Sequence, residues 1–403
     1  MRSIVVHKMS CFSITLFLVA SGFGLINNLS QGGILGTTLY VGGSGPGNYT
    51  AIQDAIDEAH DGDTVYVFSG TYHENIDLDK RLSLIGEDKN TTIIDGEQEG
   101  CTIDLSSENA IIENFTIIGG GFDTDDFINF FRAGIRVTGS NNIICNNIFR
   151  ENCLGISGVR VTNLTIIDNI FMEDGIGFTS YENDGRPILK LKYFLHNIEN
   201  NSVNGKPLYY FFNEKDKIID NWEIGQFLLV NCTNFIIKNV SISKTDWGLV
   251  FAFCNKCLIE NCNFVKNSLA IWTLESNNNL FQFNNISNNY HRGVVIDYNS
   301  NYNTIRYNEI SNTFCGVEIE WWSNANVITK NNFLNNNVSG YEHQSLFSKW
   351  YKNYYVDWIG FKKPILFFFP KLIYGMPLER IPRLVMPVSM DFFPAKEPYD
   401  IGG

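Results

Sequence analysis

Three acidic residues in the C-terminal third of the chain have a spacing that suits acid–base chemistry. Asp297 lies in the segment VVIDY, and Glu318 and Glu320 lie in the similar segment VEIEW. In a strand, residues i and i+2 lie on one face about 7 Å apart, and stacked strands bring Asp297 to within about 5 Å of Glu320. Carboxylates this close raise the pKa of one of them. The spacing therefore suits an acid–base pair for glycoside hydrolysis, or a Ca²⁺ site facing an acidic sugar.

Aromatic residues accompany these carboxylates. Trp272 occupies the same place in the segment IWTLE as Glu318 does in VEIEW, while Tyr298, Trp321 and Trp322 follow directly after the acidic segments. Aromatic side chains offer a flat apolar face on which a sugar ring can stack. Three interpretations stay open: a solvated outer face without function, a surface that binds sugars without cleaving them, and a catalytic site of a lyase or hydrolase.

Cysteines form the other cluster with chemical potential. Cys254, Cys257 and Cys262 have the spacing C-x₂-C-x₄-C, which is a weak candidate for a metal site because no fourth ligand is evident nearby. Cys232 and Cys254 occupy equivalent repeat positions, so a disulfide and simple stacking in the core are both open. Cys262 stands where other repeats have Asn, which predicts an inward-facing residue.

The elements that position these residues come from an internal repeat. Nine-residue windows share an apolar residue at the fourth and ninth positions and often Asn at the seventh, with a modal period of about 22–24 residues. The windows begin at Asn109, Asn141, Asn163, Asn234, Lys256, Asn278, Tyr302 and Ala325. Small residues form a second ladder and predict a tight bend before each alternating segment. These are Gly155, Gly177, Gly248, Ala270, Gly293 and Gly316.

Such a repeat predicts stacked short strands. A unit this short cannot bury its apolar face alone, whereas stacked units share one core. We therefore expect an all-β fold, a parallel β-solenoid of eleven or twelve coils in which Asn side chains link successive turns. In each alternating segment the first and third residues should face the core, and the second and fourth should face outward.

Composition limits the alternatives. The 403 residues carry a formal net charge of −13, which argues against a nucleic-acid partner. Hydrophobic residues make up 44% and charged residues 18%, which excludes a disordered chain. The 49 Asn residues are unusual for a helical enzyme, because Asn favours turns.

The domain organisation follows from these patterns. Residues 1–30 read as a signal peptide or an uncleaved N-terminal anchor. Residues 40–340 are expected to form the β-helix, with insertions at about 119–132 and 181–222, the second carrying a projecting hairpin at Asn204 and Gly205. Residues 341–403 are expected to form an aromatic C-terminal cap. Loops that extend from a solenoid commonly bind ligands.

The segment YTAIQDAIDEAHDGDTVYVFSGTYHENIDLDKRLSLIGEDKNTTIIDG contains a short amphipathic helix with Ile52, Ala55, Ile56 and Ala59 on one face. This segment resembles the start of right-handed parallel β-helix proteins of the pectin-lyase-like superfamily. The Asn-rich repeats, the NGKP segment and the closing FFPAKEPYDI resemble exported archaeal proteins with the NosD-type β-helix. The resemblance covers roughly residues 40–401. It implies a right-handed parallel β-helix with a capping helix, and an outer sheet face on which enzymes of this fold place their carboxylates.

We therefore expect an exported or cell-surface β-helix that binds a polysaccharide or glycan, or has a structural role, without catalysis. The substrate-binding candidates are Trp272, Tyr298, Trp321 and Trp322. The alternative is a polysaccharide lyase or glycoside hydrolase that uses Asp297, Glu318 and Glu320. A minor alternative, implied by the NosD resemblance, is an accessory protein for copper insertion. No cofactor is required in the main interpretation, and Ca²⁺ is the candidate ion. The membrane would be a partner only through an uncleaved N-terminal segment, and the oligomeric state stays open.

Overall fold

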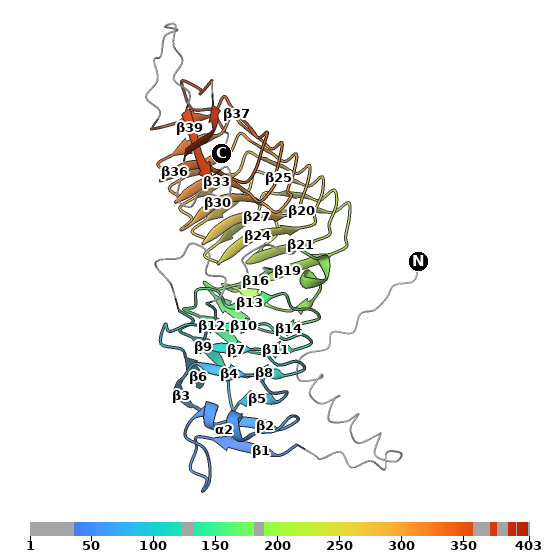
Figure 1. Cartoon of the computed structure of the whole chain (residues 1–403), viewed down its shortest axis with the longest axis vertical. Coiled ribbons are helices and arrows are strands. Elements are labelled where there is room, and N and C mark those ends of the chain that lie inside the picture. The colour runs from blue at the N-terminus through green and yellow to red at the C-terminus, as the bar shows by residue number, and fades with distance from the viewer. Residues whose placement is uncertain are drawn as a thin grey trace, which may run out of the picture. The chain divides into compact units, whose positions relative to one another are not determined.

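The computed structural model describes residues 36–121, 132–180, 189–357, 371–376, 386–391 and 393–401. These residues form two compact units. The first runs to Met172 and also includes His196–Ser202, and the second comprises Glu173–Leu195 and the chain from Val203 onward. Each unit is a stack of short parallel strands (Figure 1), and the fold is a right-handed parallel β-solenoid of about 14 turns. The predicted fold class is confirmed.

The first unit contains three parallel sheets. Its first sheet contains β1 (Thr38–Val41), β2 (Thr64–Val67), β5 (Ser83–Gly86), β8 (Ile111–Glu113), β11 (Ile143–Cys145), β14 (Thr165–Ile167) and β17 (Asn197–Glu199). Its second contains β3 (Gly70–His73), β6 (Thr92–Asp95), β9 (Thr116–Ile118), β12 (Ile148–Arg150) and β15 (Ile170–Met172). Its third contains β4 (Ile76–Leu78), β7 (Ile103–Leu105), β10 (Ile135–Val137) and β13 (Ile156–Val159). The stacked strands enclose a continuous apolar core.

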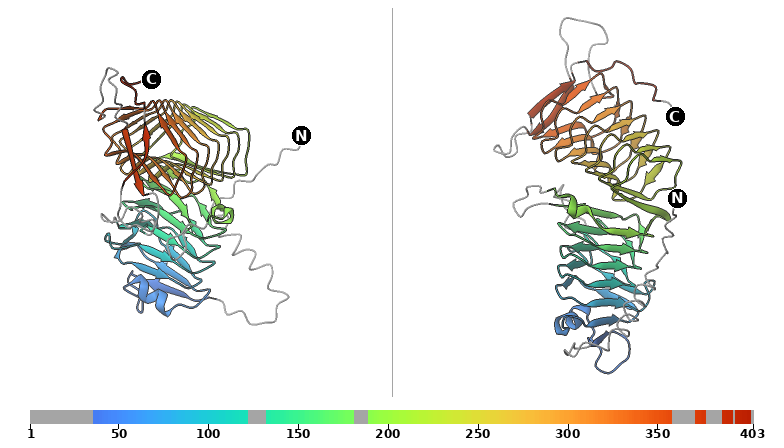
Figure 2. Two further views of the ribbon diagram at one scale, coloured as in Figure 1. Left: turned by 45° about the horizontal axis from the view of Figure 1, so that its top comes forward. Right: turned by 90° about the vertical axis from the view of Figure 1, so that its right-hand side faces the viewer.

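The helix α2 (Ile52–Glu58) closes one end of this unit, beside β1 and β2 (Figures 1 and 2). Ile52, Ala55 and Ile56 are fully buried, and Ala59, one residue past the helix, is also buried. The predicted amphipathic face is therefore confirmed. Covering the terminal coil keeps its core residues and strand edges away from water.

The second unit also has three sheets. The first short-strand sheet contains β20 (Ile218–Asp220), β22 (Ile236–Lys238), β25 (Leu258–Glu260), β28 (Leu280–Gln282), β31 (Thr304–Arg306), β34 (Val327–Thr329) and β37 (Lys349–Tyr351). The second short-strand sheet contains β23 (Ser241–Ser243), β26 (Asn263–Val265), β29 (Asn285–Ser287), β32 (Glu309–Ser311), β35 (Asn332–Leu334) and β38 (Tyr354–Tyr355). The long-strand sheet contains β19 (Lys206–Phe212), β21 (Gln226–Val230), β24 (Trp247–Ala252), β27 (Leu269–Leu274), β30 (Arg292–Asp297), β33 (Cys315–Glu320), β36 (Val338–His343), β39 (Lys371–Met376) and β40 (Met386–Asp391).

The coils of the second unit are held in register by inward Asn side chains, as predicted. Asn308 Oδ1 accepts the backbone N–H of Asn284 at 3.0 Å, and its Nδ2 donates to the carbonyl of Phe281 at 3.0 Å. The residue before each of these amides has positive φ, for example 53° at Tyr307. The left-handed residue turns the corner, and the following Asn satisfies the backbone groups that the turn leaves unpaired.

Replacing Asn308 by Ala is expected to lower the free energy of unfolding by about 2–4 kcal/mol. The substitution leaves a buried backbone N–H and a buried carbonyl without their partner. Urea denaturation, monitored by tryptophan fluorescence, measures the effect. Asn337→Ala is the matched control, because Asn337 is exposed and its side chain makes no hydrogen bond to another described residue. Equal stability of the two variants would contradict the role of the ladder.

The small-residue ladder has a different cause from the one predicted. Gly248, Gly293 and Gly316 lie within long strands and do not have positive φ, so no tight bend occurs there. A Cβ at Gly293 would lie 2.5 Å from the carbonyl oxygen of Gly316 in the next coil, and one at Gly248 would lie 2.7 Å from that of Ala270. Close approach of the neighbouring backbone therefore requires these glycines.

Two other expectations differ from the structure. The solenoid has about 14 turns, more than the eleven or twelve expected, because the repeat windows left out coils such as that of β37 and β38, where Trp350, Asn353 and Tyr355 carry the same motif. The hairpin at Asn204 and Gly205 does not project. Its turn has positive φ at both residues and leads directly into β19, which pairs in parallel with β21.

Several sequence-predicted segments lie wholly or partly outside the described residues. Residues 1–30 and most of the first insertion are among them, as are part of the second insertion and much of the C-terminal cap. Regular coils continue past residue 340, through β37 and β38. Within the described ranges, none of the helices has the length and apolar character needed to cross a membrane.

Candidate functional site

The predicted carboxylates lie on the outward side of the long-strand sheet, on neighbouring strands. Val295 of β30 pairs with Glu318 of β33, and Ile296 pairs with Ile319. The same register places Asp297 beside Glu320, and Glu320 in turn pairs with His343 of β36. The sequence-based prediction that stacking brings Asp297 next to Glu320 therefore holds in the structure.

Each carboxylate has a specific partner. Trp272 Nε1 donates to Asp297 Oδ2 at 3.1 Å, and the backbone N–H of Tyr298 donates to Asp297 Oδ1 at 2.9 Å. Arg292 Nε donates to Glu318 Oε2 and forms an ion pair with it. Glu320 Oε1 lies 3.9 Å from His343 Nδ1. We call Asp297, Arg292, Glu318 and Glu320 the carboxylate cluster.

Of the three interpretations left open for this face, that of a solvated outer face is wrong. Asp297 is 3% exposed and Glu318 6% exposed, although both point away from the coil interior. Trp272 is 2% exposed because its ring packs edge-on against Trp247 at 4.7 Å. Gly177 of β16 (Ile176–Thr179) covers that neighbour, since a Cβ there would lie 2.2 Å from the Trp247 ring. The outer face of the sheet is therefore a second buried layer.

Burial also changes the protonation of the cluster. Burial raises the pKa of Asp297, the hydrogen bonds from Trp272 and Tyr298 lower it and the nearby charge of Glu318 raises it, so that together they bring the pKa to about 8. Burial, followed by the charges of Glu318 and Asp297, raises the pKa of Glu320 well above its usual range. One arginine thus neutralises one of three carboxylates, and Asp297 and Glu320 are held in the protonated form at neutral pH.

This arrangement has the chemistry of an acid–base pair, but a substrate cannot reach it. A protonated Asp297 beside Glu320 has the proton that a general acid needs. A general acid must also touch its substrate, and Asp297 is almost completely covered, while the Glu320 side chain keeps 20% of its surface exposed. In this conformation the carboxylate cluster is therefore part of the buried layer on the sheet and does not offer a contact surface to a sugar.

The four aromatic candidates separate into two pairs. Trp272 and Tyr298 are buried, and Tyr298 stacks on Trp321 at 6.2 Å. Neither buried ring can stack on an external sugar. Trp321 is half-buried, and Trp322 is 52% exposed. The structure therefore leaves Trp322, supported edge-on by Trp321, as the accessible ring of the predicted set.

Two further aromatic side chains that sequence analysis missed lie on the corner that follows the long-strand sheet, one in the coil before Trp322 and one in the coil after it. Tyr302 is 64% exposed and Phe347 is 79% exposed. Backbone hydrogen bonds join the three successive coils at this corner: Tyr302 N donates to Asn324 O, and Trp322 N donates to Gln344 O. We call Tyr302, Trp322 and Phe347 the aromatic corner. In the sequence, Tyr302 is visible only as a departure from Asn at the first position of the repeat.

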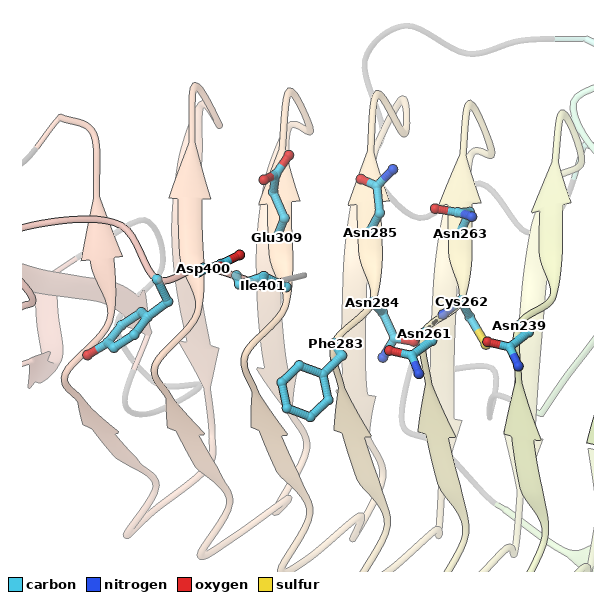
Figure 3. A pocket seen from close by; sticks show the side chains of 11 residues that line it. Asn239, Asn261, Cys262, Asn263, Phe283, Asn284, Asn285, Glu309, Asp400 and Ile401 are labelled. Atoms are coloured by element: carbon cyan, nitrogen blue, oxygen red, sulfur yellow. Dashed lines mark hydrogen bonds between the residues drawn. The ribbon is translucent and has the colours of Figure 1, made fainter. Parts of the chain in front are cut away.

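A groove of about 710 Å³ lies on another corner, between the two short-strand sheets (Figure 3). Its walls are mostly amides from consecutive coils, and Phe283 contributes a ring that is 36% exposed. The lining residues are Asn239, Asn261, Cys262, Asn263, Phe283, Asn284, Asn285, Glu309, Tyr399, Asp400 and Ile401. The sequence signal for this groove is an Asn at the eighth position of three repeat windows. These residues are Asn263, Asn285 and Asn332.

The cysteine candidates face the core. Cys254, Cys257 and Cys262 are at most 2% exposed. Cys262 occupies a position of the inward Asn ladder, where its backbone N–H donates to Asn284 Oδ1 at 2.9 Å. Burial raises the pKa of Cys257 to about 12 and that of Cys262 to about 11, which favours thiols over metal-binding thiolates. Cys232 and Cys254 are free and hydrogen-bonded, so stacking in the core is confirmed over a disulfide. Within the described ranges, no three His, Cys, Asp or Glu side chains are placed to hold a metal ion.

A search of the curated proteins gave no match. Among solved structures, the chain is similar to the A-module of the mannuronan C-5 epimerase AlgE4 of Azotobacter vinelandii at 13% identity, with a TM-score of 0.32, covering 74% of this chain and 89% of that one. It is similar to the GH136 lacto-N-biosidase of Eubacterium ramulus at 11% identity, with a TM-score of 0.33, covering 84% and 68%.

A third similar structure is the catalytic domain of a GH87 alpha-1,3-glucanase, at 14% identity with a TM-score of 0.38, covering 79% of this chain and 67% of that one. The family model described as "Right handed beta helix region" matches residues 225–353. These residues span β21 to β37 of the second unit, including the carboxylate cluster and the aromatic corner. The family match and the strand pairing thus agree that this part of the chain is a right-handed β-helix.

Proposed function

We propose that the protein binds a polysaccharide or glycan without cleaving it, through the aromatic corner of the second unit. The observation that carries this proposal is the backbone conformation of Tyr302, Trp322 and Phe347, which have φ of 59°, 60° and 63°. Bulky residues rarely adopt this left-handed conformation, because their Cβ crowds the neighbouring carbonyl at a cost of about 1–2 kcal/mol.

The fold itself does not require rings at these positions. In the column of Tyr302 and Phe347, other coils have Asn234 and Asn278, also with positive φ. Asn suits this conformation best among residues other than Gly, since its short polar side chain bonds locally. The aromatic residues are thus less favourable for the corner, and they also expose apolar surface to water. Exposed apolar surface retained at such a cost is typical of a binding site.

The surroundings favour a sugar as the ligand. Asn301 and Asn324 lie beside the rings, and each uses one amide N–H for a local carbonyl and its Oδ1 for the next coil. A second N–H and a lone pair of each amide stay available to hydroxyl groups. Flat rings for the C–H faces of a sugar, together with amides for its hydroxyls, suit a carbohydrate chain that lies across several coils.

The proposal includes a location outside the cell, which is supported by the apolar segment followed by polar residues within positions 1–30. Binding is favoured over cleavage because Asp297 and Glu318 are buried beneath the sheet face. No cofactor is part of the proposal. Parallel experiments with Ca²⁺ and with a chelator would show whether an ion contributes.

The test is the variant Tyr302→Asn/Trp322→Asn/Phe347→Asn. We expect it to lose at least tenfold in affinity for whichever neutral or acidic polysaccharide retards the wild-type protein in affinity electrophoresis. We also expect its free energy of unfolding to be equal to or higher than that of the wild type, because Asn relieves the strain at the corner. A loss of binding without loss of stability would separate ligand contact from folding.

Tyr290→Asn provides the matched control, since Tyr290 is 73% exposed but lies on a different corner and does not have positive φ. Its polysaccharide affinity should stay at the wild-type value. The proposal fails if no polysaccharide in the panel retards the wild type, or if the triple variant binds as tightly as the wild type. Shortened polysaccharide chains in size-exclusion chromatography would instead support the enzymatic alternative.

A further inference from the structure

The C-terminal segment of the chain lies on the corner that carries the groove between the two short-strand sheets. Residues 393–401 follow this corner, with Ala395 N donating to Asn353 O at 2.8 Å. Asn332 then binds Tyr399 through both amide groups. Its Oδ1 accepts the Tyr399 N–H at 2.9 Å, and its Nδ2 donates to the Tyr399 carbonyl at 2.9 Å. One side-chain amide therefore clamps one residue of an extended backbone.

The same clamp position recurs in the neighbouring coils. Strand register aligns Asn332 with Glu309, Glu309 with Asn285, and Asn285 with Asn263. Each is the first residue of its strand, and Figure 3 shows the Asn263, Asn285 and Glu309 side chains on successive strands of one wall. Asn332 is 3% exposed beneath the C-terminal segment, whereas Asn285 is half-buried and Asn263 is exposed. The position is covered at one end of the ladder and open at the other.

The open amides are available for new hydrogen bonds. Neither the Asn263 nor the Asn285 side chain bonds to any residue in the described part of the chain, in contrast to the inward amides of Asn284 and Asn308. An exposed amide has two donors and two lone pairs. Both open positions therefore have the groups that Asn332 uses on Tyr399.

Side-chain contacts repeat along the groove as well. The Tyr399 ring packs edge-on against Tyr307 at 5.9 Å, and Tyr307 stacks on Phe283 of the preceding coil at 5.3 Å. Phe283 remains 36% exposed and lines the groove. One coil beyond Tyr399, the groove thus presents a second ring that an aromatic or aliphatic side chain could cover.

We propose that this groove binds an extended polypeptide segment of a partner protein. Asn285 and Asn263 clamp its backbone as Asn332 clamps Tyr399, Phe283 packs against one of its apolar side chains, and the Glu309 carboxylate accepts a hydrogen bond from a backbone N–H or a basic side chain. Two coil steps from Glu309 to Asn263 span about 10 Å, which an extended chain covers with about three residues.

A polypeptide is favoured over a sugar here because the occupant that the structure shows on this ladder is a polypeptide. Main-chain recognition by repeated amides gives affinity, and the ring gives side-chain preference, as in other modes that bind extended peptides. This inference goes beyond the proposed glycan binding and uses another corner of the second unit. If the experiment contradicts peptide binding, the proposal of glycan binding is unaffected, and the reverse also holds.

The probe is a fluorescein-labelled peptide with the sequence of residues 393–401, FPAKEPYDI, added to the full chain. We expect saturable binding in fluorescence anisotropy. The double variant Asn263→Ala/Asn285→Ala is expected to weaken it at least tenfold, because four hydrogen bonds to the backbone are lost. A peptide methylated at its backbone nitrogens should bind as weakly as the double variant, since the clamp needs those donors.

Asn337→Ala is the matched control, because it removes an exposed amide from another corner, and it should bind like the wild type. The proposal is overturned if the peptide shows no saturable binding, or if the double variant binds it with wild-type affinity. It is also overturned if polysaccharide binding, but not peptide binding, depends on Asn263 and Asn285. Concentration-dependent dimerisation in analytical ultracentrifugation that the double variant abolishes would replace the partner protein by a second copy of this chain.

Discussion

Replacing Arg292 by Met is expected to lower the free energy of unfolding by about 3–5 kcal/mol at pH 7. Arg292 is the cation that pairs with Glu318, and the side chains of the two residues are 19% and 7% exposed. Burial alone would lower the pKa of Arg292, but the adjacent Glu318 carboxylate raises it, so Arg292 stays charged. Without Arg292, the Glu318 charge would be buried beside two further carboxylates.

The second-site variant Arg292→Met/Glu318→Leu tests this explanation. Removing both charges and keeping apolar volume should restore most of the lost stability, because a buried pair contributes little beyond an apolar pair of similar size. Arg306→Met is the matched control for loss of an arginine, since Arg306 binds the neutral amide of Gln282 on the first short-strand sheet. We expect it to cost no more than about 1 kcal/mol. Urea denaturation of the four proteins decides; no rescue by the double variant would contradict the explanation.

The stability of the protein is expected to fall as the pH rises from 5 to 9. The folded-state pKa of Asp297, about 8, lies above the ordinary value of 3.8, so between these values the folded protein holds a proton that the unfolded chain has released. Stability therefore decreases with pH in this window, by at most about 1.4 kcal/mol per pH unit for each such proton. Glu320, whose pKa is raised chiefly by burial, and Glu342, with a pKa of about 7, act in the same direction.

Urea denaturation at unit intervals of pH measures this slope. Asp297→Asn keeps an acceptor for Trp272 Nε1 but removes the titration, so its stability should vary less with pH than that of the wild type. The groups that face Asp297 in the structure are Trp272, Arg292, Glu318 and Glu320. Carboxyls whose pKa is lowered by hydrogen bonds, such as Asp63, titrate below the window. A flat profile, or the same slope in the Asn variant, would be the contrary outcome.

Those features of the site that depend on strand pairing alone could be predicted from the sequence. The alternation in VVIDY and VEIEW placed Asp297, Glu318 and Glu320 on one face, and the repeat placed Asp297 beside Glu320, as the register of β30 and β33 shows. Alternation assigns a side chain to a face, but it does not tell whether that face is covered. The coverage of Trp272 by its neighbour, and of that neighbour by Gly177, joins residues far apart in the chain.

The binding surfaces show the same division. The inward Asn ladder was predictable, because each amide repeats at the seventh position of a window. The clamp of Asn332 on Tyr399 was not, since it depends on where residues 393–401 fold back onto the coils. The aromatic corner was likewise missed at Tyr302 and Phe347, because a ring at a turn position has no periodic partner in the sequence.

By itself, the sequence determined the solenoid, its parallel strands and the residues that face its core. It could do so because every coil bonds to the next coil in the same register, so that a local period is also a map of contacts. Only the tertiary structure decided which outward faces are buried, which corners expose rings, and which amides are already occupied. These features depend on single long-range contacts. Each such contact occurs once in the chain, so it produces no periodic pattern in the sequence.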